Sequence, residues 1–154
     1  VIIRSHGVTS GEMRQMRDKG FRIVDATCPF VKKTHEYVEL LVKEGYFVIV
    51  VGEKEHPEVK GILSYGEKDI IAASSVEDLQ SMLRKKSIGI VAQTTQSIEN
   101  LQAVVAHCLK KASEIKVFNT ICNATSVRQQ ESIEIAKQVE PKKLVCYPFI
   151  ISFR

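Results

Sequence analysis

The chain is 154 residues long, 44% of its residues are hydrophobic, and its formal net charge is +4. This composition indicates a globular protein with enough apolar residues to bury a core, and the mild basic excess suits small anionic ligands. Sparse aromatic residues with no interleaved basic cluster exclude nucleic acid as a partner, and the lack of an apolar run of about 18 residues excludes a membrane span.

Short apolar runs alternate with segments of helical periodicity along most of the chain. In chain order, the expected elements are a strand over 1–3, a helix over about 9–19, a strand over 21–24, a helix over about 30–43, a strand over 46–51, a short helix from 57, a strand over 69–73, a helix over about 75–85, a strand over 87–92, a helix over about 98–112, a strand over 116–118 and a helix over about 126–139. Strand, polar turn and capped helix recur as one unit, which predicts an α/β fold with parallel sheets and right-handed crossovers.

Two capping boxes mark expected helix starts, one formed by Thr9 with Glu12 and the other by Ser126 with Gln129. In each box a side chain at the helix start and one three residues later satisfy backbone donors reciprocally. These signals support the helical assignment of the segments that follow them.

Four cysteines, Cys28, Cys108, Cys122 and Cys146, are widely spaced with no CxxC pair, which fits a reducing compartment. Cys28 follows a strand and precedes Pro29, which pre-sets φ for the first turn of a helix. Ligands bind at the carboxyl ends of strands in open parallel sheets, so Cys28 is either placed for chemistry or is a small buried hydrophobe. Cys108 lies on an apolar helical stripe and is expected to be an inert core residue. Cys28 and Cys122, if the fold gathers them, would suit a buried metal or iron–sulfur centre.

Polar residues capable of chemistry occupy the turns that follow strands. His6 and His56 can donate hydrogen bonds to an anion, and they lie beside the free N–H groups of helix starts. Both kinds of group bind phosphate. Glu58 is either a proton carrier, if a partly buried site raises its pKa and Thr94 relays through its hydroxyl, or a helix-start carboxylate stabilised by the helix dipole. His35 shares the apolar face of its helix, as a satisfied core residue or as a ligand.

Five short motifs occur in one order along residues 1 to about 139. They are Ser-His-Gly-Val (5–8), Asp-Ala-Thr-Cys-Pro (25–29) with Lys33 and His35, His-Pro-Glu-Val-Lys-Gly (56–61), Gln-Thr-Thr (93–95) and Thr-Ile-Cys-Asn-Ala-Thr (120–125) with Arg128 and Gln129. In order and approximate spacing they resemble the 4-hydroxy-3-methylbut-2-enyl diphosphate reductase family (IspH/LytB).

The resemblance implies an iron–sulfur oxidoreductase of the non-mevalonate isoprenoid pathway, which reductively removes an allylic hydroxyl to give isopentenyl and dimethylallyl diphosphates. It implies a [4Fe-4S] cluster held by three cysteines, two of which match Cys28 and Cys122, while the third belongs to a segment upstream of Val1. A small allylic diphosphate is the implied substrate, and ferredoxin or flavodoxin is the implied electron donor.

The resemblance also assigns roles to individual side chains. His6 and His56 match diphosphate-binding histidines, with His56 also in the catalytic group. Glu58 matches the proton-delivering acid, Thr94 matches the hydroxyl that orients the substrate and the proton path, and Thr95 is expected to contact the substrate beside it.

The family fold is three similar α/β domains around a central cluster. Mapped onto it, residues 1–27 end the first domain, 28–119 form a complete second domain, and 120–154 begin a third, with an atypical tail from 141. In that tail Cys146 is a conceivable substitute ligand, although its flanks resemble no family motif. The chain alone is expected to be inactive, and the parent protein to be cytoplasmic in a bacterium, or in a plastid if a transit peptide precedes Val1.

A different class of function is also compatible with the residues. In a non-catalytic anion-binding α/β module, His6, His56 and the helix starts would hold a phosphate and the cysteines would be incidental. A structural zinc domain is disfavoured because no local CxxC or HxxxH spacing is present. Iron uptake separates the first alternative from the reductase.

Overall fold

The computed structural model describes residues 1–66 and 68–138. The chain divides into two compact units, Val1–Ile121 and the segment from Cys122 onward. The expected domain boundaries after residues 27 and 119 remain predictions.

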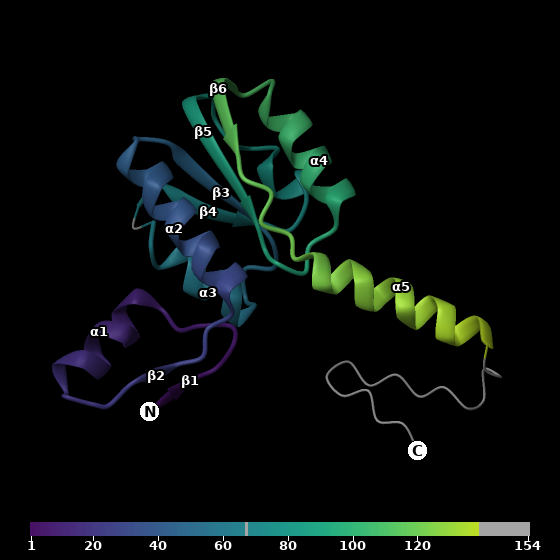
Figure 1. Cartoon of the computed structure of the whole chain (residues 1–154). Helices are drawn as coiled ribbons and strands as arrows, with labels where there is room; N and C mark the ends of the chain where they lie inside the picture. Colours follow the sequence, from purple (N-terminus) through teal and green to yellow (C-terminus); the bar gives the residue numbers. More distant parts are fainter. Residues whose placement is uncertain (67, 139–154) are drawn as a thin grey trace. The chain divides into compact units, whose positions relative to one another are not determined.

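Strands and helices alternate through the first unit (Figure 1). The elements are β1 (Ile2–Ile3), α1 (Ser10–Asp18), β2 (Val24–Asp25), α2 (Pro29–Lys43), β3 (Phe47–Val51), α3 (Pro57–Leu63), β4 (Ile70–Ala73), the 3-10 helix η1 (Val76–Leu79), β5 (Lys85–Ala92), α4 (Ile98–Cys108) and β6 (Ala112–Val117). The second unit contains α5 (Asn123–Gln138).

The strands β1 and β2 form a small parallel sheet joined through α1. Thr9 and Glu12 make the expected capping box at the start of α1, and Gly20, with φ of 70°, follows the end of this helix. Because the two strands are parallel, the turn after β1 and the turn after β2 lie at the same edge.

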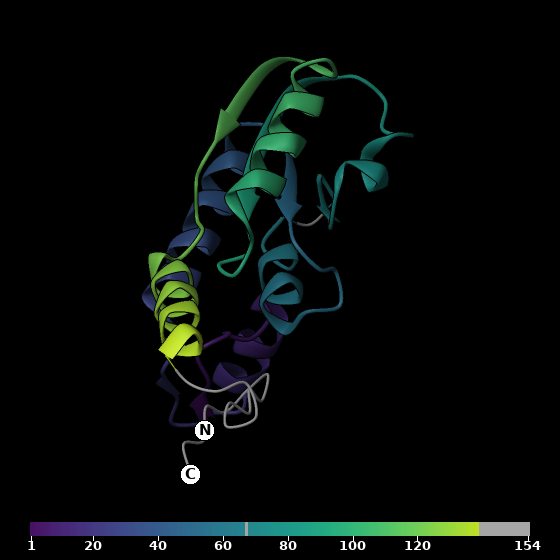
Figure 2. The same cartoon turned by 90° about the vertical axis from the view of Figure 1, so that its right-hand side faces the viewer.

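A four-stranded sheet forms the centre of the first unit, in the order β4-β3-β5-β6, and all its pairings are parallel. The helices α2 and α3 pack on one face, and η1 and α4 pack on the other. Figure 2 shows α4 in front of the sheet with α2 behind it. The predicted α/β architecture with parallel sheets is confirmed for this part of the chain.

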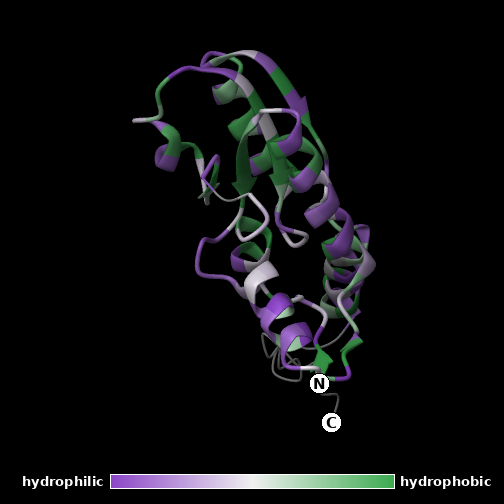
Figure 3. Ribbon diagram, turned by 90° about the vertical axis from the view of Figure 1, so that its left-hand side faces the viewer, coloured by the Kyte–Doolittle hydropathy of each residue, from purple (hydrophilic) through white to green (hydrophobic). Residues whose placement is uncertain are grey.

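Alternation along β3 divides the core between the two faces. Val48 and Val50 pack with α2 and α3, whereas Ile49 and Val51 pack with α4 and η1, and all four are fully buried. A strand buried on both faces has no polar face, which explains the unbroken apolar run in the sequence. In Figure 3 the strands of this sheet are mostly in hydrophobic colours, whereas α1 is mostly hydrophilic.

The strand order creates a switch point between β3 and β5. The chain leaves β3 through α3 toward β4 at one edge, and it leaves β5 through α4 toward β6 at the other edge. In open parallel sheets a crevice forms outside the carboxyl ends of two such strands, and ligands bind there. This position defines where a site is expected.

One expected helix is wrong, and the end of another is misplaced, because strand pairing overrides local signals. The helix expected over about 75–85 is reduced to η1, and β5 begins at Lys85, whose partner is Ala112 in β6. The helix expected over about 98–112 ends at Cys108, and β6 begins at Ala112 rather than at the expected Lys116. The β5–β6 ladder therefore starts earlier than the expected strands.

Two further elements show smaller differences. The strand expected over 21–24 is observed only as Val24–Asp25. The last helix begins at Asn123, so Ser126 lies inside it and is not its N-cap. The tail from 141, with Cys146, lies outside the described residues. Among the residues that the structure does describe, no helix is long and apolar enough to cross a membrane.

Candidate functional site

A buried carboxylate and a buried threonine meet at the switch point. Glu58 is only 1% exposed, and Thr94 is also buried. The backbone N–H of Thr94 donates to Glu58 Oε1 at 2.7 Å, and its Oγ1 hydroxyl donates to Glu58 Oε2 at 2.8 Å. Each carboxylate oxygen thus has a donor, which is the condition under which a carboxylate tolerates burial.

The positions of these two residues follow from the sheet. Glu58 lies in the first turn of α3, shortly after β3, and Thr94 lies two residues after β5. The loops after the two strands approach closely because Gly52 has no side chain: a methyl carbon there would lie 2.8 Å from Gln93 Cβ. Gln93 Oε1 accepts from the N–H of Glu53 at 3.1 Å, which joins the two loops by a side chain.

His56 is the N-cap of α3. Its Nδ1 accepts from the backbone N–H of Glu58 at 3.1 Å. An imidazole nitrogen that accepts carries no proton, so the proton of neutral His56 is on Nε2. The cap therefore leaves Nε2–H as a donor toward a ligand.

His6 lies against His56 although 50 residues separate them in the chain. Their ring centroids are 5.4 Å apart with the planes at 80°, an edge-to-face contact. Nδ1 of His6 is buried and has no hydrogen-bond partner among the residues described. An unpaired buried nitrogen at the edge of a candidate site calls for an explanation, and a ligand that supplies the partner is one.

The turns after β1 and β2 hold His6 and Cys28 side by side. The N–H of Cys28 donates to the carbonyl of Ser5 at 2.9 Å. Gly7 has φ of +75°, a conformation that a glycine adopts without strain, and its N–H donates to Arg4 O at 3.0 Å. The parallel pairing of β1 and β2 therefore places the two turns next to each other.

Cys28 is the N-cap of α2, and Pro29 is the first residue of that helix as expected. Its thiol is free, partly exposed and makes no capping hydrogen bond. A thiol without a structural partner at a helix start fits a metal or cluster ligand. Within 1–66 and 68–138, however, no three His, Cys, Asp or Glu side chains are grouped to hold a metal ion.

Cys122 and Cys108 lie in different units of the chain. Cys122 is the first residue of the second unit, directly before α5, so its position relative to Cys28 stays a prediction. Cys108 is fully buried, and burial raises the pKa of its thiol to about 11. The expectation that Cys108 is a core residue is confirmed, and its lack of reactivity stays a prediction.

Of two threonines near the site, Thr95 has a predicted role and Thr120 has none of its own. Thr95 is exposed, and its Oγ1 accepts from Gln93 Nε2 at 3.0 Å. Thr120 was not singled out individually, yet it is buried and its Oγ1 accepts from the N–H of Ala92 at 2.8 Å. Thr120 thereby holds the carboxyl end of β5, and only its place in the motif 120–125 could have drawn attention to it.

His35 is buried on α2, with 7% of its surface exposed. Its ring stacks on Tyr65, with centroids 4.3 Å apart and planes at 22°. Burial lowers the pKa of its imidazole to about 4, so it is neutral near pH 7. The expectation of a core histidine is confirmed, but Nε2 has no hydrogen-bond partner in the described part of the chain, so the ring is not fully satisfied.

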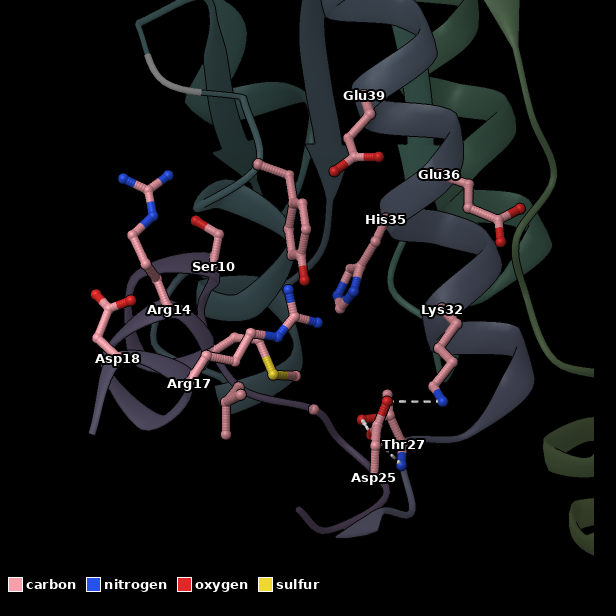
Figure 4. Close-up of a pocket in the computed structure, with 14 residues that line it drawn as sticks. Ser10, Arg14, Arg17, Asp18, Asp25, Thr27, Lys32, His35, Glu36 and Glu39 are labelled. Carbon is pink, nitrogen blue, oxygen red and sulfur yellow. Dashed lines mark hydrogen bonds and ion pairs between the residues drawn. The ribbon is translucent and has the colours of Figure 1, made fainter. Parts of the chain in front are cut away.

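A separate cavity of about 500 Å³ lies between α1 and α2 (Figure 4). Its lining mixes charges of both signs, and one pair, Lys32 with Asp25, forms a 2.7 Å ion pair. The charged lining residues are Arg14, Arg17, Asp18, Asp25, Lys32, Glu36 and Glu39. None of the residues that meet at the switch point lines this cavity, and its mixed charge favours no anion.

Comparison with known proteins gives a consistent set of similarities. The LytB protein family matches residues 1–145. A 4-hydroxy-3-methylbut-2-enyl diphosphate reductase of Trichlorobacter lovleyi is 51% identical over 140 residues, and one of Pelobacter propionicus is 54% identical over 140 residues. Each alignment covers 91% of this chain and 50% of the relative, so the chain spans about half the length of these curated relatives.

Solved structures agree with the fold. A structure of (E)-4-hydroxy-3-methyl-but-2-enyl diphosphate reductase, described as the terminal enzyme of the non-mevalonate pathway, is 47% identical with a TM-score of 0.78. The comparison covers 90% of this chain and 50% of that chain. The reductase from Plasmodium falciparum, at 28% identity, also has a TM-score of 0.78, over 89% of this chain and 44% of its own.

Proposed function

The chain belongs to the LytB protein family, and on that premise we propose that it is part of a 4-hydroxy-3-methylbut-2-enyl diphosphate reductase. The proposed reaction removes the allylic hydroxyl of the substrate with two electrons and two protons. The C–O bond breaks, water leaves, and a new C–H bond gives isopentenyl or dimethylallyl diphosphate. This chain would contribute substrate binding and proton delivery.

The observation that carries the proposal is the meeting of four side chains from the turns that follow β1, β3 and β5. Glu58 and Thr94 are joined by two hydrogen bonds, His56 caps the helix that carries Glu58, and His6 contacts His56. Two imidazoles that can donate N–H bonds stand beside a buried carboxylate. That combination suits a diphosphate at one end of a substrate and a protonated oxygen at the other.

In the proposed assignment, His6 and His56 bind the diphosphate, with Nε2–H of His56 as one donor. Glu58 delivers the proton, and the hydroxyl of Thr94, already bonded to Glu58 Oε2, orients the carboxyl group. Thr95, which is exposed next to Thr94, contacts the substrate. His56 also fixes the start of α3 and so the position of Glu58.

Cys28 and Cys122 are the proposed ligands of a [4Fe-4S] cluster, with the third thiolate supplied from outside this chain. The free thiol of Cys28 at the start of α2 supports its part in this assignment. When bound, such a cluster supplies electrons and a Lewis-acidic iron for the departing hydroxyl group. A small electron carrier such as ferredoxin or flavodoxin is the proposed donor, and the bacterial relatives favour the cytoplasm as the proposed location.

A chimera tests the proposal directly. The aligned 140 residues of this chain replace their counterpart in the Trichlorobacter lovleyi relative, and the purified protein is assayed anaerobically with the allylic diphosphate and a chemical reductant. We expect turnover, and loss of kcat by about 100-fold or more in Glu58→Gln, since positioned acids contribute that much.

Iron and sulfide analysis of the same chimera tests the ligand assignment. We expect about four irons, and fewer in Cys28→Ser, whereas Cys108→Ser should keep the full content. A folded chimera that binds pyrophosphate but neither takes up iron nor turns over substrate would favour the anion-binding module.

A further inference from the structure

His35 lies behind the turn that carries His6. A methyl carbon built on Gly7 would lie 3.4 Å from Cε1 of His35, so the ring backs this turn directly. The same ring is fixed on its other side by the stack with Tyr65. His35 thus connects α2 with the turn after β1.

Gly61 of α3 completes the surroundings of His35. A methyl carbon built there would have three nearest neighbours outside its own helix turn: His35 Nε2 at 3.7 Å, Val8 O at 3.7 Å and His6 O at 3.9 Å. All three atoms are polar, one able to donate and two able to accept. Because Gly61 has no side chain, the space beside its Cα is bounded by Nε2 of His35 and by the carbonyl oxygens of Val8 and His6.

Proteins bury a water molecule where a space large enough to hold it is bounded by two to four polar groups. His35 Nε2 has no partner among the described protein atoms, and an unpaired buried nitrogen destabilises a fold. One water beside Gly61 would accept from Nε2–H and donate to the two carbonyl oxygens. That arrangement would satisfy the imidazole and attach it to the His6 turn.

We propose that His35 is a positioning residue for His6: its Nε2–H, through one water held beside Gly61, fixes the carbonyls of His6 and Val8 and so the place of the His6 ring against His56. The proposal rests on the proposed function only where it concerns diphosphate binding. His35 does not touch the substrate in this arrangement. Its effect is to keep two anion-binding imidazoles at one spacing.

The side chain of His35 can be exchanged so that packing and hydrogen bonding are separated. Gln places an N–H donor where histidine has Nε2, and Met has a similar length without a donor. In histidine-labelled protein, we expect His35→Gln to keep the NOE between the His6 and His56 rings, and His35→Met to lose it. The affinity for inorganic pyrophosphate should fall about tenfold in His35→Met and be retained in His35→Gln, as expected for one buried hydrogen-bonded contact.

A glycine pair gives an independent test. Gly61→Ala improves helix propensity and its methyl meets only ordinary contact distances, yet it fills the proposed water site. We expect it to behave like His35→Met. Gly11→Ala, also inside a helix but with nothing within 4 Å of the new methyl, should leave the NOE and the pyrophosphate affinity unchanged.

The outcomes are distinct. If His35→Met and Gly61→Ala keep both the ring contact and the pyrophosphate affinity while remaining folded by circular dichroism, the positioning role is wrong. If the unaltered chain binds no pyrophosphate, the anion-binding part of the proposed function fails, and the NOE between the two rings still decides the role of His35.

Discussion

Thr94 engages both carboxylate oxygens of Glu58, one through its backbone and one through its side chain. Thr94→Val removes only the hydroxyl bond and leaves a buried oxygen of Glu58 without that donor. We expect a loss of about 1–3 kcal/mol in the free energy of unfolding, because an unsatisfied buried acceptor keeps its desolvation cost. Urea denaturation measures this, with Thr94→Ser as the control that keeps the hydroxyl. Equal stability of the two variants would contradict the assignment.

The two nitrogens of His56 have separable tasks. Asn caps helices well, so His56→Asn should retain the stability of α3 while removing the Nε2 donor. His56→Ala should lose the cap as well, at a cost of about 1 kcal/mol. Thermal unfolding and pyrophosphate titration together check this. The interpretation fails if His56→Asn binds pyrophosphate as tightly as the unaltered chain.

The neutral, buried state of His35 gives the stability a pH dependence. Its folded pKa of about 4 lies below the unfolded value of about 6.5, so the unfolded chain binds more protons between these values. The stability that neutral His35 contributes is fully present above about pH 6.5. It is lost as the pH falls toward 4, by at most about 3 kcal/mol in the free energy of unfolding. Denaturation at about pH 7 and about pH 4.5 measures the loss, and His35→Gln should show a smaller one.

Gly89 of β5 lies where α2 packs closely against the sheet. A methyl at Gly89 would lie 2.7 Å from both terminal carbons of Leu41, which is fully buried. We expect Gly89→Ala to cost about 1–3 kcal/mol of stability through overpacking. Chemical denaturation measures it, and Leu41→Val in the same background should recover part of the loss. A neutral Gly89→Ala would mean that α2 can shift away from the sheet.

The thiols of Cys28 and Cys108 should differ in reactivity. Cys28 is partly exposed, whereas Cys108 is fully buried with its pKa raised to about 11. Because the thiolate is the reactive form, iodoacetamide at mild alkaline pH should modify Cys28 first and reach Cys108 only after unfolding. Peptide mass spectrometry over time follows both sites. Equal rates under native conditions would contradict the burial of α4 against the sheet.

Two helix starts set by adjacent residues were predictable from the sequence, whereas the start predicted at Ser126 was wrong. Thr9 with Glu12 and the proline at position 29 gave correct helix starts, because a cap depends on neighbours in the chain. The starts of β5 and β6 were not predictable in this way. They depend on the pairing of Lys85 with Ala112, and these two residues are remote from each other in the sequence.

The residues of the candidate site were predictable from the sequence, but the contacts among them were not. His6, Glu58 and Thr94 were predicted because each lies in a turn that follows a strand, and ligands bind at the carboxyl ends of parallel strands. Histidine is not a preferred N-cap, so the cap formed by His56 had no sequence signal. The approach of Gly61 to His35 depends on how α3 packs near α2, which no local pattern encodes.

The switch point also has a consequence for how the chain folds. The chain passes through β4 on one side of β3 before it reaches β5 on the other side, so the Glu58–Thr94 contact closes a loop of 36 residues. Non-local pairings of this kind form late and slowly, since the entropy of loop closure is lost before the contact is made. We therefore expect the candidate site to be among the last parts of the molecule to assemble, and a nascent chain that has not yet paired β5 with β3 to lack the Glu58–Thr94 contact.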